Sequence, residues 1–107
     1  MEGFRGLRVW QDAMDLAVLI YRVTSIFPKH ETYGLMSQMR RASTSIPANL
    51  AEGNARRGRG EYLHFVSIAR GSLAELDTYL ELCVRLETFH RARSPRYWTN
   101  PAQSADS

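Results

Sequence analysis

The sequence predicts an all-α fold built on three long helices. Apolar residues recur every three or four positions through three long stretches of the chain, which is the spacing of one face of an α-helix. Proline or glycine ends the first two stretches, and no segment shows the alternating pattern of a strand. The chain of 107 residues is short enough for one domain, which we expect over residues 1–87.

The first helix is expected over residues 7–27, where Pro28 stops it. It carries two adjacent apolar faces. One comprises Leu7, Trp10, Met14, Ala17, Val18 and Tyr21, and the other comprises Val9, Ala13, Leu16, Ile20, Val23 and Phe27. A helix that is apolar over more than half of its circumference must be covered on more than one side. Because so short a chain has little to cover it with, we expect one of these faces to lie in a subunit interface.

The second helix is expected over residues 35–52, with Gly53 as its C-terminal cap. Its apolar stripe comprises Leu35, Met39, Ala42, Ile46 and Leu50. The far side carries the short side chains of Ser37, Thr44, Ala48 and Ala51, which permit the close approach of another helix. Pro47 lies in the interior, where it removes a backbone hydrogen bond and predicts a kink. The hydroxyls of Ser43, Thr44 and Ser45 are expected to satisfy the freed backbone groups.

The third helix is expected over residues 61–87. Its apolar arc comprises Tyr62, Phe65, Val66, Ala69, Leu73, Leu76, Leu80, Cys83 and Val84. Gly71 lies on the opposite side with small neighbours, and tight packing against another helix would explain it. Residues 88–107 contain two prolines and no periodicity, so we expect a disordered tail.

Composition limits the function classes. Apolar residues make up 44% of the chain, which excludes intrinsic disorder. The single cysteine excludes an intrachain disulfide and fits a reducing compartment. No apolar run approaches the roughly 18 residues of a membrane span, and the N-terminus lacks the apolar core of a signal peptide. We therefore expect a cytoplasmic protein with no membrane partner.

Charge is unevenly distributed along the chain. The net charge is +3, but residues 1–60 contain nine basic and five acidic residues. Thirteen of the fourteen basic residues are arginine, whose planar guanidinium suits phosphate or carboxylate. A GC-rich genome would produce the same arginine bias.

Four segments resemble the four helix bundle protein family, also called the 23S rRNA intervening-sequence proteins. They read F-R-G-L-R-V-W-Q-D-A-M-D-L from Phe4, I-Y-R-V-T-S-I-F-P-K-H-E-T-Y-G-L from Ile20, S-Q-M-R-R-A-S-T-S-I-P-A-N-L-A-E-G from Ser37, and E-Y-L-H-F-V-S-I-A-R-G-S-L-A-E-L-D-T from Glu61. The resemblance covers residues 4–87. It implies an antiparallel up-and-down bundle that assembles into a homo-oligomeric ring, typically a pentamer. A fourth helix usual in the family is expected to be missing here, replaced by the tail.

The resemblance also implies partners rather than a reaction. A related protein, the accessory variability determinant of diversity-generating retroelements, pairs with a reverse transcriptase and binds nucleic acid. For most family members no biochemical activity is established. RNA, DNA and a protein such as a reverse transcriptase are therefore the partners that the resemblance suggests.

The candidate nucleic-acid-binding residues are Arg40, Arg41, Arg56, Arg57 and Arg59. Arg41 borders the apolar stripe, where it could instead pair with a carboxylate such as Glu75. Arg40 points elsewhere and is expected to be more exposed. The other three lie in a glycine-containing loop, which could equally be a solvated basic loop. In a ring, this cluster would be repeated in every subunit and would bind phosphates in a salt-dependent way.

A polar stripe lies beside the apolar stripe of the second helix. Its members are Gln38, Ser45, Asn49 and Glu52. Since buried polar groups need partners, a structural network around Pro47 is the simpler interpretation, and ligand binding is the alternative.

Catalysis is not expected. Glu61 and His64 have the Glu-x-x-His spacing of di-iron bundles once, whereas such a site needs it on two helices. Cys83 lies on the apolar arc and is interpreted as a core residue. We therefore predict no cofactor, no metal and no enzyme activity. The sequence predicts a nucleic-acid-binding adaptor or scaffold, with a purely structural assembly module as the alternative.

Overall fold

A computed structural model describes residues 3–31 and 34–88 of the chain. These residues form three α-helices: α1 (Arg8–Thr24), α2 (Leu35–Ala55) and α3 (Arg59–Arg85). Two short 3₁₀ segments, η1 (Gly3–Gly6) and η2 (Lys29–Glu31), precede α1 and α2. The described residues contain no strand, so the all-α prediction is confirmed. The predicted disordered tail lies outside the described residues, apart from Thr88.

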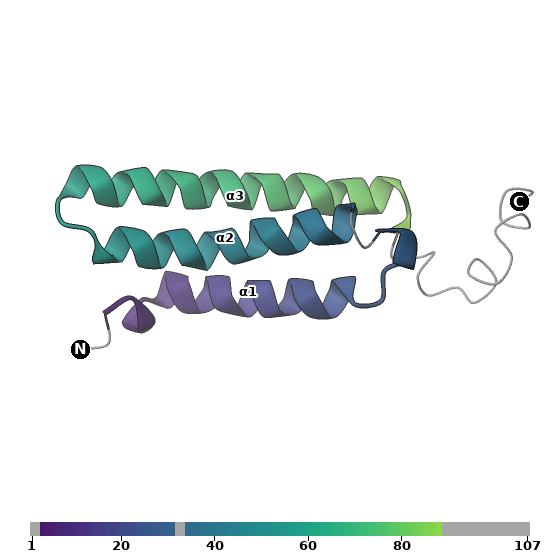
Figure 1. The fold of residues 1–107 in the computed structure, drawn as a ribbon, viewed down its shortest axis with the longest axis horizontal. Helices are drawn as coiled ribbons and strands as arrows, with labels where there is room; N and C mark the ends of the chain where they lie inside the picture. The colour runs from purple at the N-terminus through teal and green to yellow at the C-terminus, as the bar shows by residue number, and fades with distance from the viewer. Residues whose placement is uncertain (1–2, 32–33, 89–107) are drawn as a thin grey trace, which may run out of the picture.

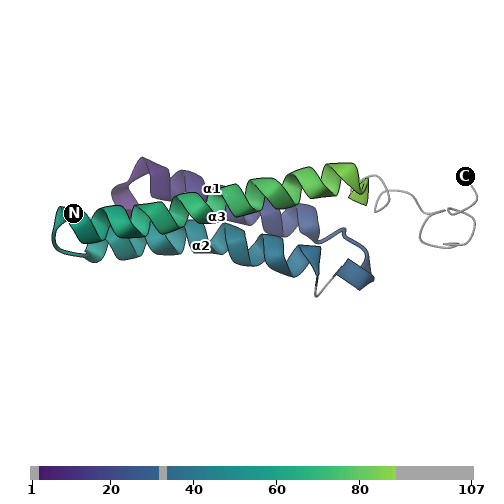
Figure 2. The ribbon, with the colours of Figure 1, turned by 90° about the horizontal axis from the view of Figure 1, so that it is seen from above.

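The three helices run antiparallel in an up-and-down order, with α2 between the other two (Figure 1). α2 packs against both neighbours, whereas the backbones of α1 and α3 do not approach each other. A view from above shows α3 lying over the other two helices (Figure 2). This arrangement makes α2 the central element and leaves α1 and α3 each covered mainly from one side.

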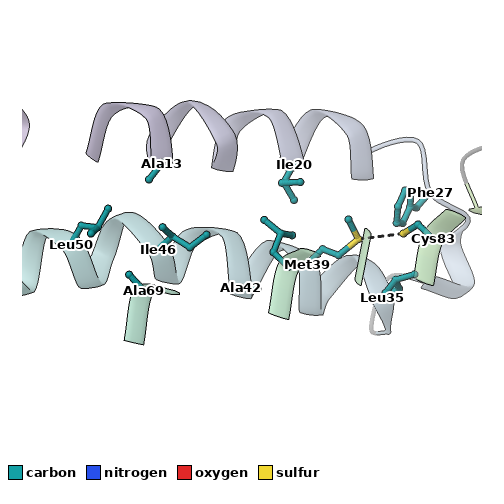
Figure 3. Packing of buried hydrophobic residues seen from close by; sticks show 11 residues of the cluster. Ala13, Ile20, Phe27, Leu35, Met39, Ala42, Ile46, Leu50, Ala69 and Cys83 are labelled. Carbon is teal, nitrogen blue, oxygen red and sulfur yellow. Dashed lines mark hydrogen bonds between the residues drawn. The ribbon is translucent and has the colours of Figure 1, made fainter. Parts of the chain in front are cut away.

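The core lies along α2, because the predicted apolar stripe of this helix is buried throughout. Its five members, Leu35, Met39, Ala42, Ile46 and Leu50, are all in the core cluster. α1 contributes Ala13 and Ile20, and α3 contributes Ala69, Leu76 and Cys83 (Figure 3). Met39, Leu76 and Cys83 are each at most 1% exposed, and the thiol of Cys83 lies 3.6 Å from the sulfur of Met39. The prediction that Cys83 is a core residue is confirmed.

α1 ends at Thr24, three residues before the predicted end. Its last turn is closed by hydroxyls, with Thr24 Oγ1 donating to the carbonyl of Ile20 at 2.6 Å and Ser25 Oγ donating to that of Arg22 at 2.6 Å. The effect of Pro28 reaches back along the chain, because a proline disfavours helical backbone angles in the residue before it, which is Phe27 here. The chain therefore leaves the helix ahead of Phe27, which is buried in the core.

Gly53 does not cap α2, so this prediction is wrong. The helix continues to Ala55, and Gly53 lies inside it against α3. A Cβ on Gly53 would lie 3.0 Å from Phe65 Cβ and 3.3 Å from the carbonyl oxygen of Tyr62. The chain reverses instead at Gly58, whose φ of +87° favours glycine, and α3 begins two residues earlier than predicted. α3 ends at Arg85, two residues before its predicted end.

Pro47 lies inside α2 and is buried, and the helix is continuous through it. The hydroxyls expected to compensate for Pro47 have other partners. Ser43 Oγ and Thr44 Oγ1 each donate to the carbonyl of Arg40 at 3.0 Å, and Ser45 Oγ shares a hydrogen bond with Ser72. Pro47 leaves the carbonyl of Ser43 without its usual backbone donor. The three hydroxyls bond to the carbonyl of Arg40 or to Ser72 and not to this carbonyl.

Much of the apolar surface of α1 is uncovered within one copy of the chain. Val9 and Leu19 are each 54% exposed, and Met14, Val18 and Tyr21 are exposed as well. Among the described residues, the buried positions of α1 are Ala13, Ala17, Ile20 and Thr24, and α3 does not approach the backbone of α1. This agrees with the expectation that α1 needs more cover than one short chain provides.

Candidate functional site

Arg40 of α2 forms hydrogen bonds to two residues of α1. Its Nε donates to Thr24 Oγ1 at 2.8 Å, and its Nη2 donates to the carbonyl of Tyr21 at 3.1 Å. The guanidinium also lies 4.5 Å from the centre of the Tyr21 ring. Thr24 is fully buried, so this hydrogen bond satisfies a polar group that water cannot reach. The expectation that Arg40 is the more exposed of the two adjacent arginines is wrong.

Arg41 pairs with Glu75 of α3, as the simpler interpretation predicted. Its Nη2 lies 3.4 Å from Glu75 Oε2 and also donates to the side-chain oxygen of Gln38. Glu75 Oε2 accepts a second hydrogen bond, from the hydroxyl of Tyr79 at 3.0 Å. This bond to Glu75, together with desolvation, raises the pKa of Tyr79 above its ordinary value of 10.0. Arg41 thus belongs to a bridge between α2 and α3 that faces solvent.

Of the three other arginines in the predicted set, Arg56 and Arg57 lie in the α2–α3 loop and Arg59 is the first residue of α3. They differ in what their side chains contact. Arg56 lies 3.3 Å from the carboxylate of Glu52 and 5.2 Å from the centre of the Phe65 ring. Arg57 and Arg59 are exposed, and among the described residues neither guanidinium has a hydrogen-bond or ion-pair partner. These two guanidiniums are therefore the members of the predicted set best placed to take an external ligand.

The tertiary structure adds two arginines to this end of the bundle. α1 runs antiparallel to α2, so η1 and the start of α1 lie at the end that carries the α2–α3 loop (Figure 1). Arg5 and Arg8 come from these segments and are exposed. Arg8 pairs loosely with Asp12 at 3.6 Å, and Arg5 lies 4.7 Å from the Phe4 ring.

We call the resulting surface the basic end, defined by five residues: Arg5, Arg8, Arg56, Arg57 and Arg59. Its two N-terminal members were not in the predicted set. The expected antiparallel order of the first two helices was the signal that could have found them, because it places the start of one beside the end of the other.

The predicted polar stripe divides into two parts. Asn49 Nδ2 donates to the carbonyl of Ser45 at 2.8 Å and to its hydroxyl at 3.0 Å, and that hydroxyl lies 2.8 Å from Ser72 Oγ of α3. This part is a structural network between two packed helices, as the simpler interpretation proposed. Gln38 and Glu52 instead pair with arginines, as described above.

An apolar groove of about 500 Å³ lies between α1 and α2, and we call it the α1–α2 groove. Its lining joins the uncovered face of α1 to the small-residue face of α2. The residues are Trp10, Met14, Ala17, Val18, Tyr21, Arg22, Thr44, Pro47, Ala48 and Ala51. Three of the four short side chains singled out in the second helix are among them, which fits their expected role in admitting another helix.

The described residues contain no group of three or more metal-ligating side chains. His64 is exposed and packs edge-on against Phe65, with ring centres 5.3 Å apart. Within residues 3–31 and 34–88, no helix is both long enough and apolar enough to cross a membrane.

Comparison with known proteins gives one clear result. The model of the 23S rRNA-intervening sequence protein family matches residues 5–97, which is most of the chain and extends beyond the resemblance seen at residues 4–87. No curated protein matches the chain. The family match and the helical architecture agree, and the chain belongs to the 23S rRNA-intervening sequence protein family.

Proposed function

We propose that this protein is a non-catalytic, homo-oligomeric adaptor of the cytoplasm that binds RNA or DNA through its basic end. The observation that carries the proposal is that the side chains of Arg57 and Arg59 are free to bind an external ligand. Both are exposed, both lack a partner among the described residues, and Arg5 and Arg8 lie at the same end. Guanidinium groups without internal partners bind phosphates without first breaking an ion pair.

Assembly strengthens this surface. The α1–α2 groove is almost wholly apolar, and Trp10, Val18 and Ala48 would be removed from water if a helix of a second copy filled it. Repeating such a contact around a ring, a pentamer by family resemblance, places one basic end on each subunit. Several weakly binding ends on one particle bind a long polyanion more tightly than a single end does.

The proposal is tested by measuring the binding of a structured RNA hairpin, and of a DNA duplex, over a series of salt concentrations. Each phosphate contact contributes about 0.9 to the slope of log affinity against log salt for duplex DNA. The double variant Arg57→Ala/Arg59→Ala should therefore lower this slope by about 1.8 for each engaged subunit. Arg56→Ala should have a smaller effect, because Glu52 and Phe65 already hold that side chain.

The matched control is Lys29→Ala/Arg85→Ala, which removes the same charge from the opposite end of the bundle. This control should bind like the unmodified protein. Equal losses in both double variants would show that only net charge matters. The absence of retardation at low salt, in protein of confirmed assembly state, would refute nucleic-acid binding altogether.

The α1–α2 groove on its own favours the second candidate, a structural assembly module with no nucleic-acid role. The exposed Ala48 lies in this groove, so Ala48→Arg should block assembly while leaving the bundle folded. Light scattering coupled to gel filtration measures the change in mass. A fall in mass with Ala48→Arg, in a protein that binds neither probe, would favour this second function.

A further inference from the structure

A second groove lies between α1 and α3 and shares no lining residue with the first. We call it the α1–α3 groove, and its volume is about 470 Å³. Leu16 lines it from α1, and the remaining lining residues come from α3: Arg70, Leu73, Ala74, Leu76, Asp77 and Leu80. Leu73 is 48% exposed, so the groove presents apolar side chains to water.

Two opposite charges, Arg70 and Asp77, border this apolar strip. Arg70 and Asp77 are exposed, and neither has an ion-pair partner among the described residues. They lie seven residues apart on the same side of α3, about 10.5 Å along the helix axis. Side chains on a helix pair at spacings of three or four residues, so these two charges are not placed to pair with each other.

The charges do complement each other across a two-fold axis. If a second α3 is laid antiparallel with the axis between Leu73 and Ala74, Arg70 of each copy lies opposite Asp77 of the other. The same axis places each Leu73 opposite an Ala74, so that a large side chain meets a small one. A parallel pair in the same register would instead place Arg70 against Arg70 and Asp77 against Asp77, and like charges repel.

We propose that the α1–α3 groove is filled by α3 of a second copy of this chain, in an antiparallel two-fold contact. The occupant is self-complementary: each copy supplies both the groove and the helix that fills the other's groove, as an isologous interface requires. The contact covers Leu73 and forms two ion pairs between Arg70 and Asp77. It uses none of the residues of the basic end or of the α1–α2 groove, so it stands or fails independently of the proposed function.

Charge reversal tests the contact. Each copy contributes Arg70 and Asp77, so one substitution changes two of the four charges in the interface. Arg70→Asp alone, or Asp77→Arg alone, places like charges opposite each other twice. Each single variant should weaken self-association, measured by sedimentation equilibrium, by roughly tenfold or more at low salt. The double variant Arg70→Asp/Asp77→Arg exchanges the partners and should restore self-association to within about twofold of the original.

Mixing the two single variants tests the pairing of Arg70 with Asp77 most directly. In an equimolar mixture of the two single variants, self-association should recover through contacts between unlike copies, because each copy of one variant presents two aspartates to two arginines of the other. Lys29→Asp is the control for Arg70→Asp, since it makes the same change of charge at an exposed position outside the groove. Circular dichroism of each variant verifies the fold, and all the substituted side chains are exposed.

Self-association of both single variants equal to that of the original protein would overturn the proposal. A double variant that stays as weak as the single variants would overturn it too, because opposite charges would then not face each other. Loss of mass with Ala48→Arg and no effect at positions 70 and 77 would leave the proposed ring standing and remove this contact.

Discussion

Substituting Gly53 with alanine tests how closely α2 and α3 approach. The added Cβ would lie 3.0 Å from Phe65 Cβ and 3.3 Å from the carbonyl oxygen of Tyr62. Carbon atoms in favourable contact lie about 3.5–4.0 Å apart, so the methyl group overlaps its neighbour. Phe65 Cβ is fixed to the backbone and cannot rotate away, and the Tyr62 oxygen is a backbone atom. The two helices must therefore separate locally.

Two opposing terms set the magnitude. Alanine in place of a helical glycine stabilises a helix by about 1 kcal/mol, and by less near a helix end, where Gly53 lies. Forcing an extra methyl group into a tightly packed contact costs about 1–3 kcal/mol. We expect Gly53→Ala to lower the free energy of unfolding by about 1–2 kcal/mol. For a domain of this size, each 1 kcal/mol lowers the melting temperature by about 4–8 °C.

Gly71 provides the matched control, because it lies in the middle of α3 with no atom within 4 Å of an added Cβ. Gly71→Ala should raise the free energy of unfolding by about 0.5–1 kcal/mol, since only the helix-propensity term acts. Urea denaturation followed by circular dichroism measures both changes. If Gly53→Ala stabilises the protein as much as Gly71→Ala does, the inferred close approach at Gly53 is wrong.

Two further predictions concern the polar contacts. Thr24→Val keeps the shape of a buried side chain but removes the acceptor for Arg40, so urea denaturation should show a loss of about 1–3 kcal/mol, and an unchanged midpoint would count against this bond. The raised pKa of Tyr79, caused first by its hydrogen bond to Glu75, means that the folded state holds the phenol proton more tightly than the unfolded state. This contribution to stability is complete below pH 10.0 and is lost as the pH rises above it, so Tyr79→Phe should make the free energy of unfolding fall less steeply there.

Local pattern was sufficient to predict the helices and the centre of the core. The spacing of Leu35, Met39, Ala42, Ile46 and Leu50 identified five buried residues of α2, because a helix in a small bundle buries the side where its apolar residues recur. Ser43, Pro47 and Gly53 of α2 are buried as well, and the predicted stripe did not include them. The pairing of Arg41 with Glu75 was one of two interpretations offered for Arg41, and the buried position of Cys83 was predicted from the apolar arc of the third helix. The predicted helix ends were less accurate. α1 ends before the residue next to Pro28, and Gly53 lies inside α2 because it packs against α3.

The sequence by itself thus determined three amphipathic helices, a family and a loop rich in arginine. Only the tertiary structure decided what each of these residues contacts. Arg40 links α2 to α1 because Thr24, sixteen residues away in the sequence, presents a buried hydroxyl to it. Gly53 is a packing position because α3 lies against it, and Arg5 belongs to the basic end because α1 is antiparallel to α2. Helical periodicity fixes which side of a helix is apolar, whereas partners distant in sequence are set by how the helices pack.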